Sequence, residues 1–335
     1  MSKYALTLCG NIVVDTTKYI DAYPAKLELT SIKSMARSLG GAVPNVGLDL
    51  GRLDPTLPLK AVGFVGEDDN GAYALQTLSA CPTLDVSDVR RQGVNSFTDV
   101  MTVQSTGERT FFTYKGADSL ITPETIPMER LDCDIFHLAY ALLLDGLDVG
   151  DDEYGTKLAR VLCGARARGM RTSLDVVSEN SDRYGRLVPP ALKYTDYFSV
   201  NEMEAERVTG VSLTGADAPT EAFREALGRL KAMGVSRWAV IHTPRLACGL
   251  DEKNRFAAVG TLRLPEGFIK GSVGAGDAFT AGLLLRAWQG ASLGEALEAA
   301  NAAAAMSLSQ PGATEGIKTL EETMAFAAGL EHRTL

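Results

Sequence analysis

Short apolar runs alternate with longer amphipathic stretches along most of the chain. Runs rich in apolar and β-branched residues and bounded by turn residues predict buried strands, at residues 4–15, 59–66, 134–143, 171–177, 237–243 and 255–264, with another inside 191–202. Stretches in which apolar residues recur every three or four positions predict helices, at residues 40–53, 69–80, 154–169, 201–210, 220–234, 276–290 and 293–312. The last two helices are expected to close the chain.

From about residue 132, strands and helices alternate to the end of the chain. This order predicts βαβ units, and therefore a mostly parallel sheet with helices on both faces. Two earlier regions, at about 16–38 and 94–115, hold short and weakly alternating segments instead. The second predicts a hairpin that turns at Thr106 and Gly107. We expect these segments to form a separate small sheet.

Composition and charge exclude several classes of protein. The 335 residues carry a formal net charge of -9, which argues against nucleic acid and anionic membrane surfaces as partners. The five cysteines form no C-x-x-C pair, so a disulfide framework or zinc site is not expected. No apolar run approaches the roughly 20 residues of a membrane span. The expected location is the cytoplasm.

A glycine-rich turn is the strongest chemical signal. The turn consists of Gly274, Ala275 and Gly276 at the start of a predicted helix, and Asp277 follows it directly. The free N–H groups and the dipole of a helix N-terminus form an anion site. The segment matches neither the lysine-containing phosphate loop nor the dinucleotide fingerprint, because no lysine follows and Phe279 occupies the place of the third small residue.

Asp277 allows two interpretations. A carboxylate repels a bound phosphate, so its position makes sense for a general base that takes a proton from an attacking hydroxyl. Asp is also a favoured residue at helix N-termini. The turn alone leaves both open.

The motif GSVGAGDAFTAG resembles the C-terminal motif of the PfkB/ribokinase family of carbohydrate kinases. A second stretch, GGAVPNVGLDLGRL followed by AVGFVGEDDNG, resembles the N-terminal pattern of that family. The likeness extends over nearly the whole chain, from GNIVVD to QPGATEG. It implies a single ribokinase-like catalytic domain over residues 1–335, a three-layer α/β/α sandwich with a mostly parallel central sheet and a small β-sheet lid.

The resemblance assigns roles to matching residues. It implies that Asp277 is the base and that Gly274, Ala275 and Gly276 form the anion hole. It implies sugar contacts from Asp15, Gly40, Gly41 and Asn45. Asp15 as a turn cap and Asn45 as a helix-terminal contact remain alternatives.

The resemblance also implies Mg-ATP as the phosphoryl donor. Asn201 and Glu204 match the N-x-x-E element of the family, in which the glutamate orients magnesium, mostly through water. Asn301 matches a position beside adenine. The family's Thr-x-Gly element is replaced by His242, Thr243 and Pro244, and proline has no N–H to offer. Either the nucleotide contact shifts to Thr243 or His242, or the nucleotide preference differs. His242 as a strand-end histidine with satisfied hydrogen bonds is a further alternative, and the favoured one.

A further departure concerns potassium. The family commonly has an aspartate six residues before the base, and here that residue is Gly271, which puts potassium activation in doubt. The small sheet is expected to cover the sugar and to pair with a second subunit in a homodimer.

Several functions stay open. The leading hypothesis is an ATP-dependent sugar kinase. The alternatives are a nucleoside kinase of the adenosine or inosine type, a sugar-phosphate kinase that uses basic residues such as Lys33, Arg37, Arg90, Arg91 and Arg109, and a catalytically inactive sugar-binding regulator. The sequence does not name the sugar or the hydroxyl that is phosphorylated.

Overall fold

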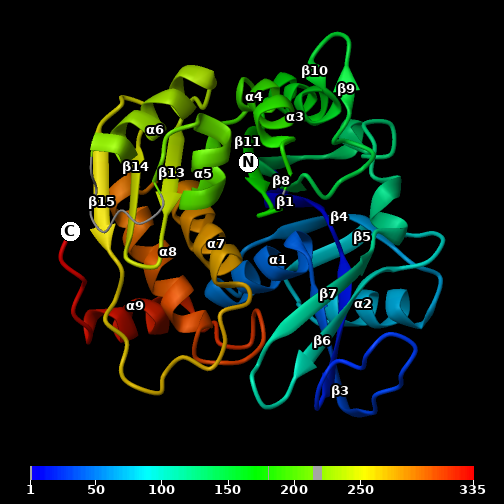
Figure 1. Ribbon diagram of the computed structural model, residues 1–335. Coiled ribbons are helices and arrows are strands. Elements are labelled where there is room, and N and C mark those ends of the chain that lie inside the picture. Colours follow the sequence, from blue (N-terminus) through cyan, green and yellow to red (C-terminus); the bar gives the residue numbers. More distant parts are fainter. Residues whose placement is uncertain (1, 180, 214–220) are drawn as a thin grey trace.

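The computed structural model describes residues 2–179, 181–213 and 221–335, and its centre is one large sheet (Figure 1). The sheet order is β15-β14-β13-β12-β11-β8-β1-β4-β5. Its strands are β1 (Tyr4–Gly10), β4 (Leu59–Val65), β5 (Leu84–Arg91), β8 (Cys133–Ala141), β11 (Arg171–Val176), β12 (Tyr197–Asn201), β13 (Trp238–His242), β14 (Leu246–Leu250) and β15 (Phe256–Gly260). All neighbouring pairs are parallel except β13–β14 and β14–β15.

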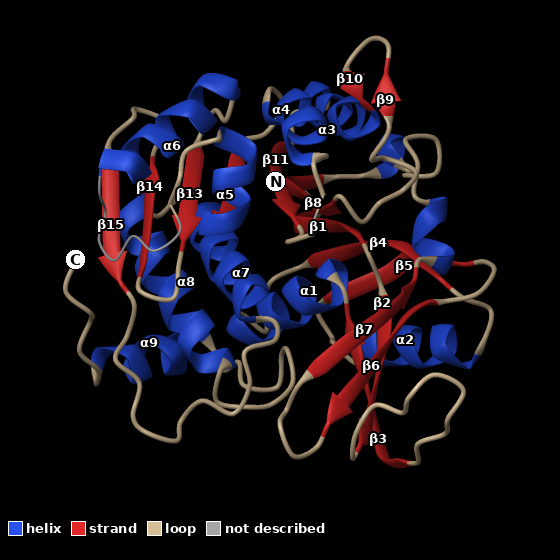
Figure 2. Cartoon of the chain, in the orientation of Figure 1, coloured by secondary structure: helices blue, strands red, loops and turns tan. Residues whose placement is uncertain are grey.

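Helices cover both faces of this sheet (Figure 2). One core joins the sheet to α3 (Lys157–Ala167), α4 (Tyr184–Leu192), α5 (Glu202–Thr209) and α6 (Glu221–Met233). The other joins it to α1 (Ala42–Leu53), α2 (Asp69–Ser79), α7 (Ala275–Trp288) and α8 (Leu293–Ser307), with α9 (Leu320–Ala328) packed outside α8. The predicted three-layer arrangement is thereby confirmed.

A second, four-stranded sheet stands apart from the large one (Figure 1). Its order is β3-β2-β6-β7, and its strands are β2 (Val13–Ile20), β3 (Ile32–Gly40), β6 (Ser96–Val103) and β7 (Arg109–Tyr114). β6 and β7 form the predicted antiparallel hairpin. The small sheet begins at Val13 rather than near residue 16, because the chain leaves the large sheet after Gly10.

Several elements differ from the sequence-based expectation. The run 4–15 was expected to hold one buried strand and its turn at Gly10 and Asn11, and its last part, from Val13, belongs to β2 in the small sheet. α4 contains Pro189 and Pro190 and gave no helical signal, since proline disfavours helix interiors. β5, β14 and α9 were also missed, so a third helix follows the two that were expected to close the chain. Thr220, expected to open a helix, lies outside the described residues.

The parallel strands bring polar side chains to one edge of the sheet. Tyr140 lies near the end of β8, Asp175 near the end of β11, Asn201 ends β12 and His242 ends β13. Ligands of open α/β sheets bind at the carboxyl ends of the strands, so this edge is where a site is expected. In the part of the chain that the structure describes, no helix has the length and apolarity needed to cross a bilayer.

Candidate active site

Asp277 lies in the first turn of α7 and is almost completely buried. The Tyr140 hydroxyl donates a hydrogen bond to Oδ1 at 2.5 Å, and Asn45 Nδ2 donates one to Oδ2 at 2.9 Å. Burial raises the pKa of Asp277 to about 6, although the bonds from Tyr140 and Asn45 work against the rise. The carboxylate is therefore ionised near neutral pH and still basic enough to take up a proton.

The turn before Asp277 has a shape that only glycine adopts readily. Gly274 precedes α7 with φ 79°, and a Cβ there would lie 2.6 Å from the carbonyl oxygen of Ala313. The first N–H groups of a helix have no acceptor within it. Those of Ala275, Gly276 and Asp277 are thus available to an anion, and Gly276 lines both of the cavities described next.

The first cavity has a volume of about 240 Å³ and is rich in carboxyl groups. We call it the acidic cavity; its walls include Tyr140, Asp175, Ser178, Asn201, Glu204, Gly276, Asp277 and Thr280. Burial raises the pKa of Asp175 well above its usual range, and the charges of Glu204 and Asp277 raise it further. Burial also raises the pKa of Glu204. Three carboxyls in one buried space repel one another, which favours binding of a cation.

Asn201 and Glu204 are joined by a capping box at the start of α5. Asn201 Oδ1 accepts from the N–H of Glu204 at 2.9 Å, and Glu204 Oε2 accepts from the N–H of Asn201 at 3.0 Å. The Ser178 hydroxyl donates to Glu204 Oε1 at 2.6 Å and accepts from Asn201 Nδ2 at 2.9 Å. The N-x-x-E pair is therefore held rigid by its own contacts and by Ser178.

The second cavity is longer, with a volume of about 620 Å³. We call it the apolar groove, since Leu262, Leu264, Ile269, Phe279, Ala304, Ala305 and Leu308 supply much of its wall. Asn201, Thr243 and Asn301 all line it. The Thr243 hydroxyl closes the turn to β14 by accepting from the N–H of Leu246 at 3.0 Å. Asn301 Nδ2 donates to the carbonyl of Gly260 at 3.4 Å.

His242 lies where the two cavities meet and lines both. Its ring packs on Phe279 with centroids 4.7 Å apart. Burial lowers the pKa of His242 to about 4, so the ring is neutral near pH 7. The side chain adds a polar surface without a charge.

Of the residues expected to hold the sugar, Asn45 contacts Asp277 directly. A Cβ at Gly40 would lie 2.3 Å from Asp15 Oδ2, so these two residues are in close contact. Gly41, with φ 93°, approaches the backbone of Asn11. Burial raises the pKa of Asp15 to about 6, while a hydrogen bond from Thr98 lowers it. The Asn45–Asp277 bond is the direct contact between this set and Asp277 among the described residues.

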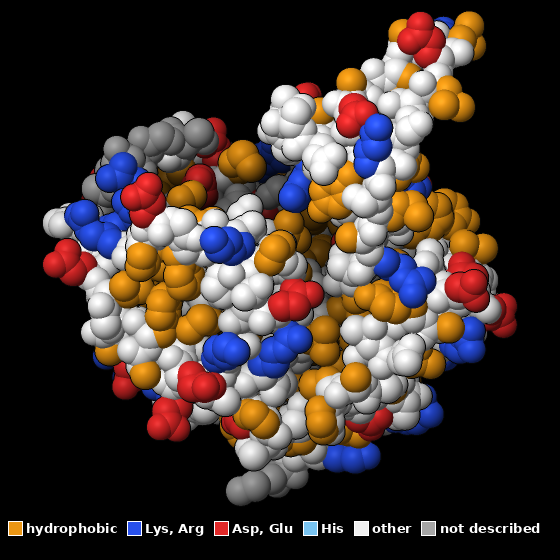
Figure 3. Space-filling view, turned by 90° about the horizontal axis from the view of Figure 1, so that it is seen from below, with side chains coloured by type: hydrophobic (Ala, Val, Ile, Leu, Met, Phe, Trp, Pro, Cys, Tyr) orange, Lys and Arg blue, Asp and Glu red, His pale blue; other side chains and the backbone are white. Residues whose placement is uncertain are grey.

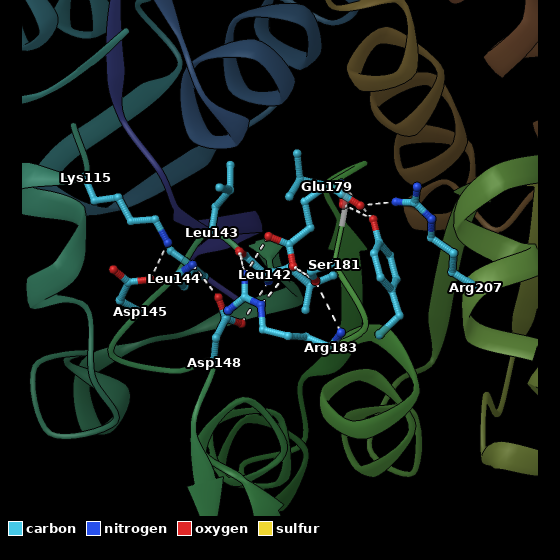
Figure 4. A network of polar contacts seen from close by, with 12 residues as sticks. Lys115, Leu142, Leu143, Leu144, Asp145, Asp148, Glu179, Ser181, Arg183 and Arg207 are labelled. Carbon is cyan, nitrogen blue, oxygen red and sulfur yellow. Dashed lines mark hydrogen bonds and ion pairs between the residues drawn. The ribbon is translucent and has the colours of Figure 1, made fainter. Parts of the chain in front are cut away.

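A polar network braces the loops that follow β8 and β11 (Figure 4). Arg183 pairs with Glu179 at 2.6 Å and donates to the carbonyl of Leu142 at 2.7 Å. Lys115, just after β7, pairs with Asp145. Each cation drawn in Figure 4 therefore has a partner, and Arg183 joins the segment after β8, at Leu142, to the segment after β11, at Glu179.

Sequence reasoning missed Tyr140, Asp175, Ser178 and Asp118. Asp118 accepts from the N–H of Ile12 at 3.0 Å and from Asn11 Nδ2 at 3.4 Å, so it supports the turn between β1 and β2. A search for polar residues at strand ends would have found Tyr140 and Asp175. No local sequence pattern identifies Asp118.

Gly271, which replaces the family aspartate, packs against the segment after α8. A Cβ at this position would lie 2.7 Å from the carbonyl oxygen of Pro311. Among the described residues, no three His, Cys, Asp or Glu side chains are placed to hold a metal ion by themselves.

Comparison with known proteins agrees with this geometry. A family model described as pfkB family carbohydrate kinase matches residues 10–320, so the chain belongs to that family. Its members are phosphotransferases, and the resemblance noted from the two sequence motifs is confirmed.

The relatives span nearly full length at low identity. The chain is 25% identical to aminoimidazole riboside kinase of Salmonella typhimurium, over 86% of this chain and 87% of that protein. It is 27% identical to ATP-dependent ribose-1-phosphate kinase of Halopiger xanaduensis, over 97% of each. The structure of ribokinase from Arabidopsis thaliana, complexed with ribose and ATP, has the same fold, with a TM-score of 0.79, 20% identity and coverage of 97% and 98%.

Proposed function

We propose that this chain is an ATP-dependent sugar kinase that transfers the γ-phosphoryl group of Mg-ATP to a sugar hydroxyl. One observation carries the proposal. A buried carboxylate, Asp277, is held by Asn45 and Tyr140 in the first turn of a helix, where free N–H groups and two cavities meet. A base beside an anion hole is the arrangement that phosphoryl transfer to a hydroxyl requires.

The proposed mechanism uses the chain's own groups. Asp15, Gly40, Gly41 and Asn45 orient the sugar so that one hydroxyl faces Asp277. Asp277 takes the proton of that hydroxyl as its oxygen attacks the γ-phosphorus. The N–H groups of the Gly274–Gly276 turn stabilise the charge on the transferred group. The depth of Asp277 excludes water, which otherwise competes as the acceptor.

We assign ATP to the apolar groove, where Asn201, Thr243 and Asn301 supply polar contacts on an apolar wall. The oxygen-rich acidic cavity fits magnesium, which prefers carboxylates, phosphate oxygens and water. Glu204, aided by Asn201 and Asp175, would hold it largely through water, consistent with the lack of a complete protein ligand set among the described residues. When bound, magnesium would neutralise charge on the ATP phosphates. The close approach of Gly271 to the carbonyl oxygen of Pro311 supports a site without the family's potassium-binding carboxylate.

The contacts of the basic residues favour an uncharged acceptor over a sugar phosphate. Lys33 pairs with Asp21, Arg37 stacks on Tyr73, and Arg90 stacks on Phe64. Arg91 bonds to the carbonyl of Gly66. Of the five basic residues considered for a sugar phosphate, only Arg109 has no described partner. The names of the two curated relatives keep ribosides and ribose 1-phosphate among the candidate acceptors.

We further propose that residues 1–335 act as one catalytic domain and that the small sheet is a lid over the sugar. Met35, Phe111 and Phe112 on this sheet are more than half exposed, which supports pairing with a second copy. Lys, Arg, Asp and Glu side chains are interspersed on the face shown in Figure 3, which supports the absence of a nucleic-acid partner. The free thiols of the described cysteines support a cytoplasmic location.

The test is an ADP-release assay with Mg-ATP over free sugars, nucleosides and sugar phosphates, with and without potassium. We expect turnover with one acceptor class and little dependence on potassium. ADP release that no acceptor increases, combined with measurable sugar binding, would instead identify an inactive regulator.

A further inference from the structure

The C-terminal segment extends the edge of the large sheet next to the apolar groove. Residues 331–333 run antiparallel to residues 260–263, just beyond β15 (Figure 1). The N–H of Arg263 donates to the carbonyl of Glu331 at 2.8 Å, and the N–H of Arg333 donates to the carbonyl of Thr261 at 2.8 Å. His332 Nδ1 lies 2.7 Å from the carbonyl oxygen of Gly260. We call residues 331–335 the tail.

The tail contact depends on the absence of a side chain at residue 260. A Cβ on Gly260 would lie 1.9 Å from the carbonyl oxygen of Arg333, which is far inside van der Waals contact. The same glycine accepts a hydrogen bond from Asn301. The tail therefore reaches the groove on the wall that carries Asn301.

Arg333 brings an unusual charge to this wall. It lines the groove with Thr261 and Leu262, and its side chain has no ion pair or hydrogen bond among the described residues. The other ionisable side chains of the described lining are the acid Glu202 and His242, whose ring burial keeps neutral by lowering its pKa. Among the described lining residues, Arg333 is thus the only cation.

We propose that Arg333 is a nucleotide-binding residue, delivered by the tail, whose guanidinium contacts the purine base of the bound nucleoside triphosphate. A planar guanidinium stacks on aromatic rings and donates to ring nitrogens. The tail packs on Gly260, whose carbonyl also accepts from Asn301, so we assign the guanidinium to the base that Asn301 is expected to contact rather than to the phosphates. This inference rests on the proposed function, in which the apolar groove holds ATP.

Two measurements on the full-length protein test the proposal. Calorimetry gives the binding of ATP and of inorganic tripolyphosphate, and steady-state kinetics gives KM and kcat. Arg333→Ala should weaken ATP binding and raise KM for ATP about 3- to 30-fold, the range of one such contact. Its kcat should stay within about twofold, since uniform binding acts on KM alone. Gly260→Ala, which displaces the tail and changes no groove side chain, should have a similar effect. Arg263→Ala, on the segment that pairs with the tail but outside the groove lining, is the matched control.

The outcomes separate this inference from the proposed function. Ala304→Phe fills the groove itself. If it abolishes ATP binding while Arg333→Ala does not change it, the tail inference is wrong and the groove assignment stands. If Ala304→Phe leaves ATP binding intact, the groove assignment fails. An equal loss of tripolyphosphate binding in Arg333→Ala would overturn the assignment to the base. Thermal melts without nucleotide show whether each variant is folded.

Discussion

The acidic cavity and the apolar groove share Asn201, His242 and Gly276, yet their walls differ in chemistry. The acidic cavity gathers Asp175, Glu204 and Asp277, and burial raises the pKa of each carboxyl. The groove is walled mostly by aliphatic side chains and Phe279. In the proposed function, charge is thus concentrated where bonds would change, and apolar surface where the nucleotide would only be held.

This difference has a physical cause. A desolvated carboxylate is a stronger base than one in water, so burial serves proton transfer. A flat aromatic ring gains most from apolar contact and a few polar groups that orient it. Substitutions in the acidic cavity should therefore change kcat, and substitutions in the groove should change KM for ATP.

Asp277→Asn should give the largest effect. The amide cannot accept the proton, so we expect kcat to fall by about 10²–10⁴, the usual contribution of a general base. ATP affinity, measured by calorimetry, should change less than about threefold. Asp69→Asn, which alters an exposed acid in the first turn of α2, is the control for a helix-terminal charge. Activity that survives in Asp277→Asn would remove Asp277 as the base.

Gly276→Ala should disturb both cavities at once. Its Cβ would meet only His242 Cε1 at 3.9 Å, so the fold tolerates alanine. A phosphate bound beside the turn would not tolerate alanine, because the added methyl group would displace the phosphate by about an ångström. We expect kcat/KM to fall by about 10²-fold, the size of such a misplacement, while the melting temperature stays constant. Gly294→Ala in the first turn of α8 is the control, because its Cβ meets nothing within 4 Å.

The sequence predicted the parts of this molecule that are encoded locally. The Gly274–Asp277 turn, the N-x-x-E capping pair and the alternation of strands and helices each depend on neighbouring residues. Tyr140 and Asp175 lie 137 and 102 positions before Asp277 in the chain, and only the sheet brings them to one cavity. α4 was missed because Pro189 and Pro190 oppose a helix that tertiary packing of Leu187 and Val188 stabilises.

Tyr140→Phe should give a smaller and pH-dependent effect. Removing the hydroxyl takes one hydrogen bond from the ionised form of Asp277, so its pKa should rise further. The base works when deprotonated, so kcat/KM should increase with pH through about 6 in the wild type. In the variant the midpoint of this increase in kcat/KM should lie about one pH unit higher, which corresponds to the loss of one hydrogen bond to a charged group. A lower rate with an unchanged midpoint would contradict this role of Tyr140. Tyr194→Phe is the control.

Asp49→Asn should change activity least and stability most visibly. Asp49 lies in α1, fully buried, and neither carboxyl oxygen has a hydrogen-bond partner among the described residues. Burial raises its pKa well above the usual range, and the charge of Asp277 adds to the rise. The folded state therefore holds this proton more tightly than the unfolded state. The stability that results is complete below the unfolded pKa of about 3.9 and is lost as pH rises toward the folded pKa.

Because the amide that replaces this carboxyl carries no charge at any pH, the stability gain of Asp49→Asn should grow with pH. We expect no gain near pH 4 and, toward pH 8, a gain that grows by up to about 1.4 kcal/mol for each pH unit between the unfolded and the folded pKa. Denaturant unfolding across this pH range measures it, with the exposed Asp152→Asn as control. The kcat should stay within about twofold, since Asp49 lines neither cavity. A gain that is the same at both pH values would mean that the pKa of Asp49 is equal in the folded and the unfolded state, and a loss of activity would place it in the catalytic machinery beside Asp277.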